Sequence, residues 1–320
     1  MILEHIKRYL PSPKHKILVG VSGGADSICL LDGLTRLAYP AVVAHFNHGL
    51  RPESSEEARI VAELAGSLGV PFYLGKGDVM HNARTHARSI EEAARILRYK
   101  FLFQKANDVK ADCVVVGHNA DDQVETVIMN LLRGSGLSGL TGMTTCRLPN
   151  PWSNTIPLRR PLLGVWREDI LAYCRSRNLN PIQDPSNKDT TFFRNRIRHE
   201  VLPVLEKNRP GFRRRVWRMA NILEGDHDSL QHAVDRLWEE LPIEKSADYI
   251  AFEVESFVEL LKGLQRRLIR RVIHYLRPGF SEISFEIVEK ARDFLVDPPK
   301  GKETNLSGRV QMVVMGKTGY

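Results

Sequence analysis

The segment Lys16–Ser27, which reads KILVGVSGGADS, decides the architecture of the first half of the chain. Its apolar part, Ile17–Val21, has the composition of a buried strand, and an apolar helical pattern begins at Ile28. Between them, Gly23 and Gly24 would let the backbone approach a bound group closely, while the helix start offers unpaired N–H groups and a positive dipole end. The segment therefore predicts a strand, an anion-binding turn and a helix, in that order.

The polar residues of this turn indicate that the anion is a phosphate. The hydroxyls of Ser22 and Ser27 can donate to it, whereas Asp26 would repel it unless a divalent cation lay between them. We therefore predict that Ser22–Ser27 holds phosphates, with Mg²⁺ at Asp26. The alternative is an ordinary strand-to-helix turn in which Ser and Asp act as caps. The Walker pattern, G-x-x-x-x-G-K-S/T, is absent from the sequence.

A second glycine-rich segment, Gly134–Gly139 (GSGLSG), matches the dinucleotide-binding pattern G-x-G-x-x-G. It follows a predicted helix, whereas the dinucleotide turn follows a strand. We therefore reject a dinucleotide cofactor at this segment.

The first 146 residues alternate short apolar runs with helical patterns, as in a parallel α/β sheet. Capping-box patterns at Ser54 with Glu57 and at Ser89 with Glu92 mark two helix starts. We predict an α/β fold with a doubly wound, mostly parallel sheet, whose ligands bind at the carboxyl ends of the strands. The expected strands are Lys16–Val21, Ala41–Phe46, Val70–Leu74 and Cys113–Gly117, and the expected helices are Ser27–Ala38, Ser54–Leu68, Ile90–Ala106 and Asp121–Arg133.

The second half of the chain predicts a smaller, mainly helical domain. A glycine-dense turn region, Gly134–Gly142, and a proline-rich passage precede three expected elements: a helix, a polar loop and a basic helix. Pro203 is expected inside the last turn of the basic helix or just beyond its end. We expect a first domain over residues 1–206, basic from about residue 147, and a C-terminal domain over 211–320. The expected elements are Trp166–Arg177, Asp184–Thr191, Phe193–Glu206 and a terminal hairpin at Glu303–Val314.

The net charge of +8 comes from the middle of the chain. Residues 147–220 carry 16 Lys and Arg against 6 Asp and Glu, whereas residues 221–320 carry 14 against 17. A basic block of this kind is expected to follow nucleic-acid phosphates, because each neutralised phosphate releases counterions. The alternative is a basic surface that only keeps the protein soluble.

Two further observations concern the compartment and the metal content. No stretch approaches the roughly 18 consecutive apolar residues of a membrane span, and the N-terminus lacks a secretory apolar region. The four cysteines form no C-x-x-C pair, so neither a disulfide framework nor a zinc or iron–sulfur site is indicated. We expect a cytoplasmic protein that does not contact a membrane.

The turn and seven further segments resemble the motifs of a known family. S-G-G-x-D-S after a first strand is similar to the PP-loop of the N-type ATP pyrophosphatases, and the other segments resemble the tRNA(Ile)-lysidine synthetases of that superfamily. The resemblance runs over roughly residues 16–206, and the family's longer members have an extra C-terminal domain for which this chain has too few residues. The segments are His45–Arg51 (HFNHGLR), Glu92–Tyr99 (EAARILRY), Gly117–Thr126 (GHNADDQVET), Leu132–Leu140 (LRGSGLSGL), Arg160–Leu163 (RPLL), Asp184–Asp189 (DPSNKD) and Arg194–Arg198 (RNRIR).

The resemblance implies an ATP-dependent ligase that modifies RNA. Such an enzyme adenylates O2 of the wobble cytidine in an isoleucine tRNA with the anticodon CAU. The ε-amine of free L-lysine then displaces AMP, which gives lysidine. The implied cofactors are ATP and Mg²⁺, the implied partners are that tRNA and lysine, and a homodimer is also implied. The implied ATP-binding residues are Ser22, Gly23, Gly24, Ala25, Asp26, Ser27 and His45.

Candidate catalytic residues follow from the same motifs. Asp122 and Glu125 would share one face of a helix, where they could bind the lysine ammonium and accept its proton. Arg98, one turn from Arg95, would stabilise charge at the α-phosphate. Without the resemblance, these side chains would be interpreted as helix-dipole partners and surface arginines. The implied tRNA-binding residues are Arg194, Asn195, Arg196, Arg198, Arg213, Arg214 and Arg215.

Two other functions stay open from the sequence. A different PP-loop ligase, such as a thiolase or an amide-forming synthetase, would use ATP without lysine. A catalytically silent tRNA-binding protein would bind RNA with a steep dependence on salt and would turn over no ATP.

Overall fold

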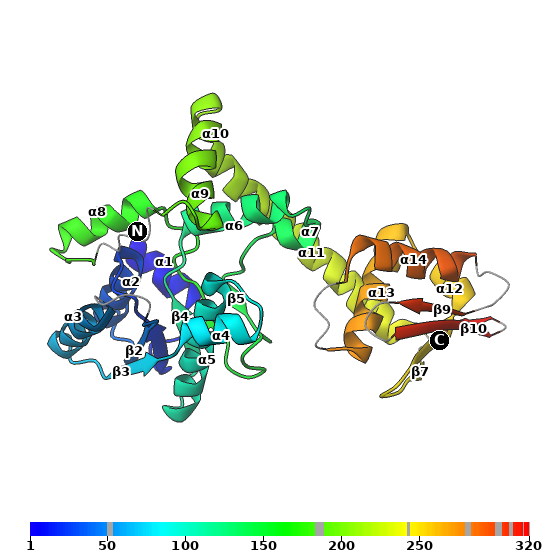
Figure 1. Ribbon diagram of the computed structural model, residues 1–320, viewed down its shortest axis with the longest axis horizontal. Coiled ribbons are helices and arrows are strands. Elements are labelled where there is room, and N and C mark those ends of the chain that lie inside the picture. The colour runs from blue at the N-terminus through cyan, green and yellow to red at the C-terminus, as the bar shows by residue number, and fades with distance from the viewer. Residues whose placement is uncertain are drawn as a thin grey trace. The chain divides into compact units, whose positions relative to one another are not determined.

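The computed structural model describes residues 1–49, 54–182, 189–241, 244–278, 283–297, 303–306, 310–315 and 317–319. The chain forms two compact units, Met1–Leu223 and Glu224–Tyr320, and each is described by itself (Figure 1). Helix α11 (Phe212–Glu240) contains the division. The sequence places the division earlier, between residues 206 and 211. The first turns of α11 belong to the first unit because Val216 and Ala220 are buried there in a cluster with residues of helix α6.

The first unit is built on a six-stranded sheet in the order β3-β2-β1-β4-β6-β5. Neighbouring strands are parallel except for β5 and β6, which confirms the predicted mostly parallel sheet. The direction in which successive strands are added reverses between β1 and β4, so the doubly wound switch point lies there. The strands are β1 (Ile17–Gly20), β2 (Ala41–Asn47), β3 (Phe72–Lys76), β4 (Cys113–Val116), β5 (Cys146–Arg147) and β6 (Leu158–Arg159).

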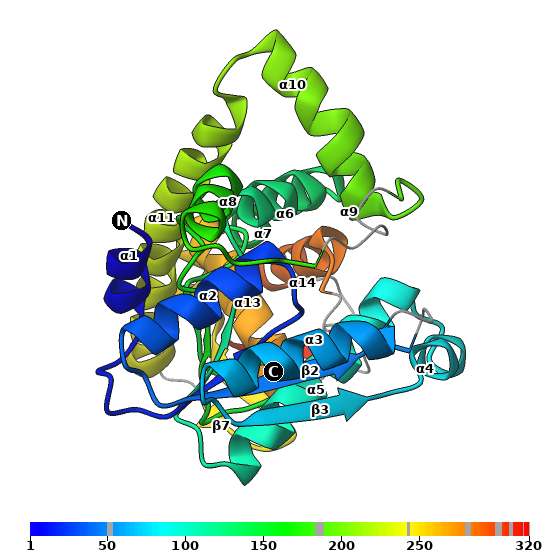
Figure 2. The same cartoon turned by 90° about the vertical axis from the view of Figure 1, so that its left-hand side faces the viewer.

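Helices cover both faces of this sheet (Figure 2). Side chains alternate across the central strands, so Ile17 and Val19 pack into one apolar cluster while Leu18 packs into another. Burial on both faces explains why these strands are apolar throughout. The first cluster contains residues of α1 (Ile2–Tyr9), α2 (Ala25–Arg36), α3 (Ser54–Ser67) and α8 (Arg167–Ser176), and the second contains residues of α5 (Ile90–Asp108).

Three further helices belong to this unit, and one of them was predicted from the sequence. Ser89 caps α5 by accepting a hydrogen bond from the N–H of Glu92, as the sequence predicts. Asp78 caps the preceding short helix in the same way, through the N–H of His81. The three helices are α4 (Val79–Thr85), α6 (Ala120–Leu132) and α7 (Leu137–Leu140), of which α6 was predicted and α4 and α7 were not.

The basic helix predicted over Phe193–Glu206 is divided into three parts. Pro203 has no N–H, and its ring crowds the carbonyl one turn before it, which accounts for the wider π-helical turn there. Pro203 therefore lies in a first helical turn, which corrects its predicted place in a last turn or beyond. The parts are α9 (Phe193–Arg196), the π-helical turn η2 (Ile197–Val201) and α10 (Leu202–Asn208).

The second unit combines helices with a sheet. The predicted terminal hairpin is present as the antiparallel pair β9 and β10, and it belongs to a five-stranded sheet in the order β7-β8-β11-β10-β9. The other strands are too short to produce a clear alternation in the sequence. The elements are β7 (Glu244–Lys245), β8 (Ile250–Glu253), α12 (Val254–Val258), α13 (Lys262–Leu276), α14 (Phe285–Val296), β9 (Glu303–Leu306), β10 (Val310–Met315) and β11 (Thr318–Gly319).

Residues 50–53 and 183–188 lie outside the described residues. The end of the His45–Arg51 motif and nearly all of the Asp184–Asp189 motif fall within these two ranges. Among the helices that the structure describes, none combines the length and the apolar composition that crossing a bilayer requires.

Candidate active site

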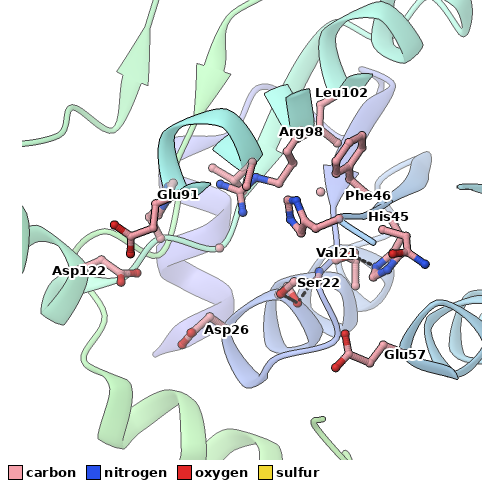
Figure 3. A pocket seen from close by; sticks show the side chains of 18 of the residues that line it. Val21, Ser22, Asp26, His45, Phe46, Glu57, Glu91, Arg98, Leu102 and Asp122 are labelled. Carbon is pink, nitrogen blue, oxygen red and sulfur yellow. Dashed lines mark hydrogen bonds between the residues drawn. The ribbon is translucent and has the colours of Figure 1, made fainter. Parts of the chain in front are cut away.

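A cavity of about 500 Å³ opens at the carboxyl ends of β1, β2 and β4. This is the switch point of the sheet, where doubly wound folds bind their ligands. Figure 3 shows that the side chains around it come from separate parts of the chain. Among the residues that line the cavity are the predicted site residues Ser22, Asp26, Ser27, His45, Arg98, Asp122, Arg194, Asn195 and Arg198.

The turn after β1 has the geometry of an anion site. Gly23 has a φ of 90°, a backbone conformation that residues with a Cβ rarely adopt. An added Cβ at this position would also lie 2.5 Å from the side chain of Ile182. Helix α2 begins at Ala25, and no side chain in the described part of the chain caps its N-terminus. The N–H of Ser27 donates to the Gly24 carbonyl at 3.1 Å, so the N–H groups of Ala25 and Asp26 are the ones that can bind an anion. The Oγ of Ser27 bridges the turn, since it accepts from the N–H of Ser22 at 3.2 Å and donates to the Gly24 carbonyl at 3.0 Å.

Asp26 follows this turn and is held by two polar partners. Its Oδ1 accepts from Nδ2 of Asn119 at 2.9 Å, and its Oδ2 accepts from Arg167 at 3.0 Å. Burial raises the pKa of Asp26, Arg167 opposes this change, and the charge of Asp122 adds to it. A cation beside Asp26 would relieve the repulsion between the two carboxylates. The position therefore fits Mg²⁺ bound by Asp26 and by phosphate oxygens of a nucleotide.

His45 supports the turn from β2. Its Nδ1 lies 2.8 Å from the carbonyl of Val21, so Nδ1 carries a proton and donates. Its side chain is only 4% exposed, and burial lowers its pKa. His45 is therefore a neutral wall residue that fixes the start of the phosphate turn.

Arg98 reaches the cavity from α5. Its guanidinium lies over the ring of Tyr99, 5.1 Å from the ring centroid. Among the described residues, no acceptor lies within hydrogen-bond distance of its Nε. The guanidinium of Arg98 thus lines the cavity, and no described carboxylate pairs with it. Arg95 is not among the residues that line the cavity, so the geometry favours Arg98 over Arg95 for contact with a nucleotide.

His118 lines the cavity directly after β4, although the sequence assigned it no role. Burial lowers its pKa well below the ordinary value, and the charges of Arg160, Arg194 and Arg98 add to this effect. A positive charge on His118 would be surrounded by arginines. His118 is therefore neutral in the folded protein at neutral pH.

This arrangement makes stability depend on pH. Because the folded-state pKa of His118 lies below its unfolded value of about 6.5, the unfolded state binds more protons as the pH falls below that value. We expect the free energy of unfolding to decrease from about pH 7.5 to pH 5.5, by at most about 1.4 kcal/mol per pH unit for this group. Urea unfolding at several pH values should show a shallower decrease for His118→Gln. The matched change at the exposed His81 on α4 should leave the slope unchanged, and equal slopes for all three proteins would contradict the assignment.

Asp122 occupies a capping box at the start of α6. The N–H of Asp122 donates to the side chain of Asn119, and Oδ2 of Asp122 accepts from the N–H of Asn119, both at 3.0 Å. Oδ2 of Asp122 thus accepts a hydrogen bond at the helix N-terminus, and Oδ1 faces Arg194 and Arg198. The capping box fixes this carboxylate at the edge of the cavity.

Glu125 lies one turn later and is almost fully buried, with 1% of its side chain exposed. Its two oxygens accept from Nε of Arg194 at 2.8 Å and from Nε of Arg198 at 2.6 Å. Both arginines also reach Oδ1 of Asp122, at 3.0 and 3.4 Å respectively. Burial alone would lower the pKa of each arginine, but the two carboxylates raise it. The structure thus brings the candidate lysine-binding pair together with two candidate tRNA-binding residues.

The other candidate tRNA-binding residues lie outside this cluster. Arg196, Arg213, Arg214 and Arg215 are exposed, although Arg213 pairs with Asp121 at 2.8 Å and Arg214 with Glu168 at 2.8 Å. Nδ2 of Asn195 donates to the carbonyl of Asp189. Exposed arginines at the start of α11 remain accessible to phosphates of a bound nucleic acid.

Sequence reasoning missed the polar residues that hold the site together. Arg167 and Asn119 fix Asp26, and Arg160 lies beside His118. The pattern Asn119-x-x-Asp122 could have indicated a capping box, because Asn and Asp are frequent at these positions. No pattern could have paired Arg167 with Asp26, since the two residues are 141 positions apart.

Known proteins resemble this chain over most of its length. It is 35% identical to the tRNA(Ile)-lysidine synthase of Dehalococcoides mccartyi over 317 residues, which cover 96% of this chain and 67% of that protein. It is 36% identical to the enzyme of that name from Geobacter sulfurreducens, over 91% of this chain and 61% of that protein. The chain thus spans about two thirds or less of these relatives. Among solved structures, the fold is shared by the U34-tRNA thiolase NcsA of Methanococcus maripaludis with its 4Fe-4S cluster. The TM-score is 0.57 at 18% sequence identity, and the match covers 70% of this chain and 78% of that chain.

The fold and the site together define an α/β nucleotide-binding protein whose phosphate turn lacks a Walker lysine. Residues 2–205 match the family model described as a PP-loop domain. The chain belongs to this PP-loop family and, within it, to the tRNA(Ile)-lysidine synthases, which confirms the resemblance of the sequence motifs.

Proposed function

We propose that this protein joins the ε-amine of free lysine to C2 of the wobble cytidine in an isoleucine tRNA with the anticodon CAU. One observation carries the proposal: a single cavity combines an anion-binding turn, an arginine with no carboxylate partner among the described residues and the edge of a carboxylate pair. These are the groups that adenylation followed by attack of an amine requires. Membership of the tRNA(Ile)-lysidine synthases supports the choice of RNA and amine.

In the first step, the phosphates of ATP lie at Ser22–Ser27. The cytidine O2 attacks the α-phosphorus, an O–P bond forms, and the bond to pyrophosphate breaks. Arg98 stabilises the charge that develops on the α-phosphate oxygens. Asp26 would hold Mg²⁺ together with the nucleotide phosphates, and the ion would then neutralise part of the pyrophosphate charge.

In the second step, Asp122 and Glu125 bind the ammonium of lysine. One carboxylate accepts a proton, which frees the lone pair of Nζ for attack. A bond from Nζ to C2 forms, and AMP leaves with the oxygen that was O2 of the cytidine. The exposed arginines of α9 and α11 contact RNA phosphates and position the anticodon loop.

The test is incorporation of labelled lysine into RNA. With ATP, Mg²⁺ and the CAU-anticodon isoleucine tRNA, we expect labelled RNA and one AMP for each lysine incorporated. A tRNA that differs only in a wobble uridine should remain unlabelled. Absence of label with a folded, ATP-binding protein would exclude the function, and AMP formation without lysine would indicate another PP-loop ligase. The homodimer and the cytoplasmic location stay predictions.

A further inference from the structure

Arg194 and Arg198 separate Glu125 from the cavity. Asp122 and both arginines line the cavity, whereas Glu125 is not among its lining residues and has only 1% of its side chain exposed. The arginine side chains are 27% and 25% exposed. The guanidinium groups therefore occupy the space through which an ammonium would reach the buried carboxylate.

The ion pairs around Glu125 are balanced, and Glu91 at the cavity wall adds a third carboxylate whose charge also acts on Arg194. Two carboxylates face two guanidinium groups, and the oxygens of Glu125 accept three hydrogen bonds from them, at 2.6, 2.8 and 3.0 Å. A lysine ammonium would be a third cation in the cluster, with Arg98 also lining the cavity. Like charges at such distances repel strongly where water is excluded. An ammonium can therefore reach Glu125 only if at least one guanidinium moves away.

The arginines cannot leave without a replacement. Removal of both partners would leave Glu125 as a buried carboxylate without a cation, which is strongly unfavourable. An entering ammonium supplies that cation, and the released guanidinium needs a new anion. RNA phosphate is well suited, because it accepts two parallel hydrogen bonds from one guanidinium as a carboxylate does.

The local backbone is consistent with such an exchange. Arg194 lies on α9 and Arg198 on the π-helical turn η2, and exposed Arg196 lies between them in the sequence. Pro203 accounts for this turn, and single π-helical turns are also frequent at functional sites. A register change at η2 would move Arg198 relative to the fixed helix α6.

We propose that Arg194 and Arg198 are exchangeable counterions that keep Asp122 and Glu125 closed to an amine until RNA phosphates bind the two guanidinium groups. The inference rests on the proposed function and adds a dependence between its two substrates. Lysine and RNA then bind with positive coupling. Because coupling between equilibrium binding events is reciprocal, lysine strengthens RNA binding by the same factor.

The experiment measures the dissociation constant of labelled lysine by equilibrium dialysis with the full chain. An ATP analogue with a methylene bridge between the α- and β-phosphates prevents turnover. Four conditions separate the sources of phosphate: no addition, the analogue alone, the CAU-anticodon tRNA alone, and both. We expect the tRNA to lower the dissociation constant of lysine about 5- to 150-fold, and the analogue alone to have a much smaller effect.

Arginine-to-methionine variants test the two residues directly. Arg198→Met leaves two carboxylates with one guanidinium, so we expect it to bind lysine more tightly than the parent without RNA and to show less coupling. Arg194→Met should behave in the same way, and it keeps the proposal testable if Arg198→Met folds poorly. Arg59→Met is the matched control, because Arg59 pairs with Glu56 and Glu63 on the surface of α3. Its lysine affinity and its coupling should equal those of the parent.

The outcomes distinguish this inference from the function on which it rests. Equal lysine affinity with and without tRNA, in a parent protein that forms lysidine, would overturn the inference alone. Equal affinity of the parent and both variants in the absence of RNA would also overturn it. A parent that incorporates no lysine into the tRNA would instead overturn the proposed function.

Discussion

Replacing Glu125 with glutamine is expected to lower lysine incorporation into the tRNA by about 100- to 10,000-fold, while ATP binding is retained. The carboxylate of Glu125 holds two arginines through both of its oxygens, and in the proposed reaction it holds the lysine ammonium. An amide has one acceptor oxygen and no charge, so it cannot balance either cation. The phosphate turn lies between β1 and the first turn of α2, and it does not contact Glu125 through any described hydrogen bond. Incorporation of labelled lysine and calorimetric binding of ATP would measure the two effects.

A loss of folding must be separated from a loss of chemistry in this variant. Breaking a buried ion pair costs about 3–5 kcal/mol, so Glu125→Gln should be assayed at low temperature after its folding is verified by circular dichroism. Asp122→Asn is the milder companion, because its side-chain oxygen can still accept from the N–H of Asn119. Glu63→Gln on the exposed surface of α3 is the matched control. Parent-like incorporation by both Glu125→Gln and Asp122→Asn would remove the carboxylate pair from the mechanism.

The central fold could be predicted because its signals are local. The strands β1 and β4 are buried on both faces, so they are continuous apolar runs, and Ser89 marks the start of α5 by a hydrogen bond within its own first turn. The short strands β5 and β6 each have two residues, which is too few for a periodic pattern. The sheet of the second unit was missed for the same reason, except for its β9–β10 hairpin.

Part of the candidate site could also be predicted from local signals, and part could not. The residues Ser22–Ser27, Arg98 and Asp122 follow from short motifs, and all of these that carry a polar side chain line the cavity. Their partners do not follow, because an arginine can pair with a phosphate or with a carboxylate far away in the sequence. Arg194 illustrates this: its motif suggested RNA, and the structure pairs it with Glu125, which is 69 positions away. Only the folded chain shows that the lysine and RNA candidates share one ion cluster.

Replacing Gly117 with alanine is expected to weaken ATP binding about tenfold or more, because it would displace the phosphate turn from outside. An added Cβ would lie 2.9 Å from the carbonyl carbon of Asp26, 3.0 Å from its oxygen and 3.1 Å from the nitrogen of Ser27. These are backbone atoms of the first turn of α2, so no side-chain rotation can relieve the contact. Overpacking of this kind typically costs about 1–3 kcal/mol. Since these atoms belong to the backbone of the turn proposed to bind phosphate, their displacement should lower ATP affinity along with folding stability.

The matched control is Gly66→Ala on α3, where an added Cβ meets no atom within 4 Å. Alanine is a better helix former than glycine, so this variant should be as stable as the parent or more stable by up to about 1 kcal/mol, with unchanged ATP affinity. Calorimetric titration with ATP and urea unfolding would measure both properties for the two variants. If Gly117→Ala bound ATP as tightly as Gly66→Ala, the close approach of the β4 end to α2 would not determine the shape of the phosphate turn. The proposed place of the nucleotide at the switch point between β1 and β4 would then lose its main geometric support.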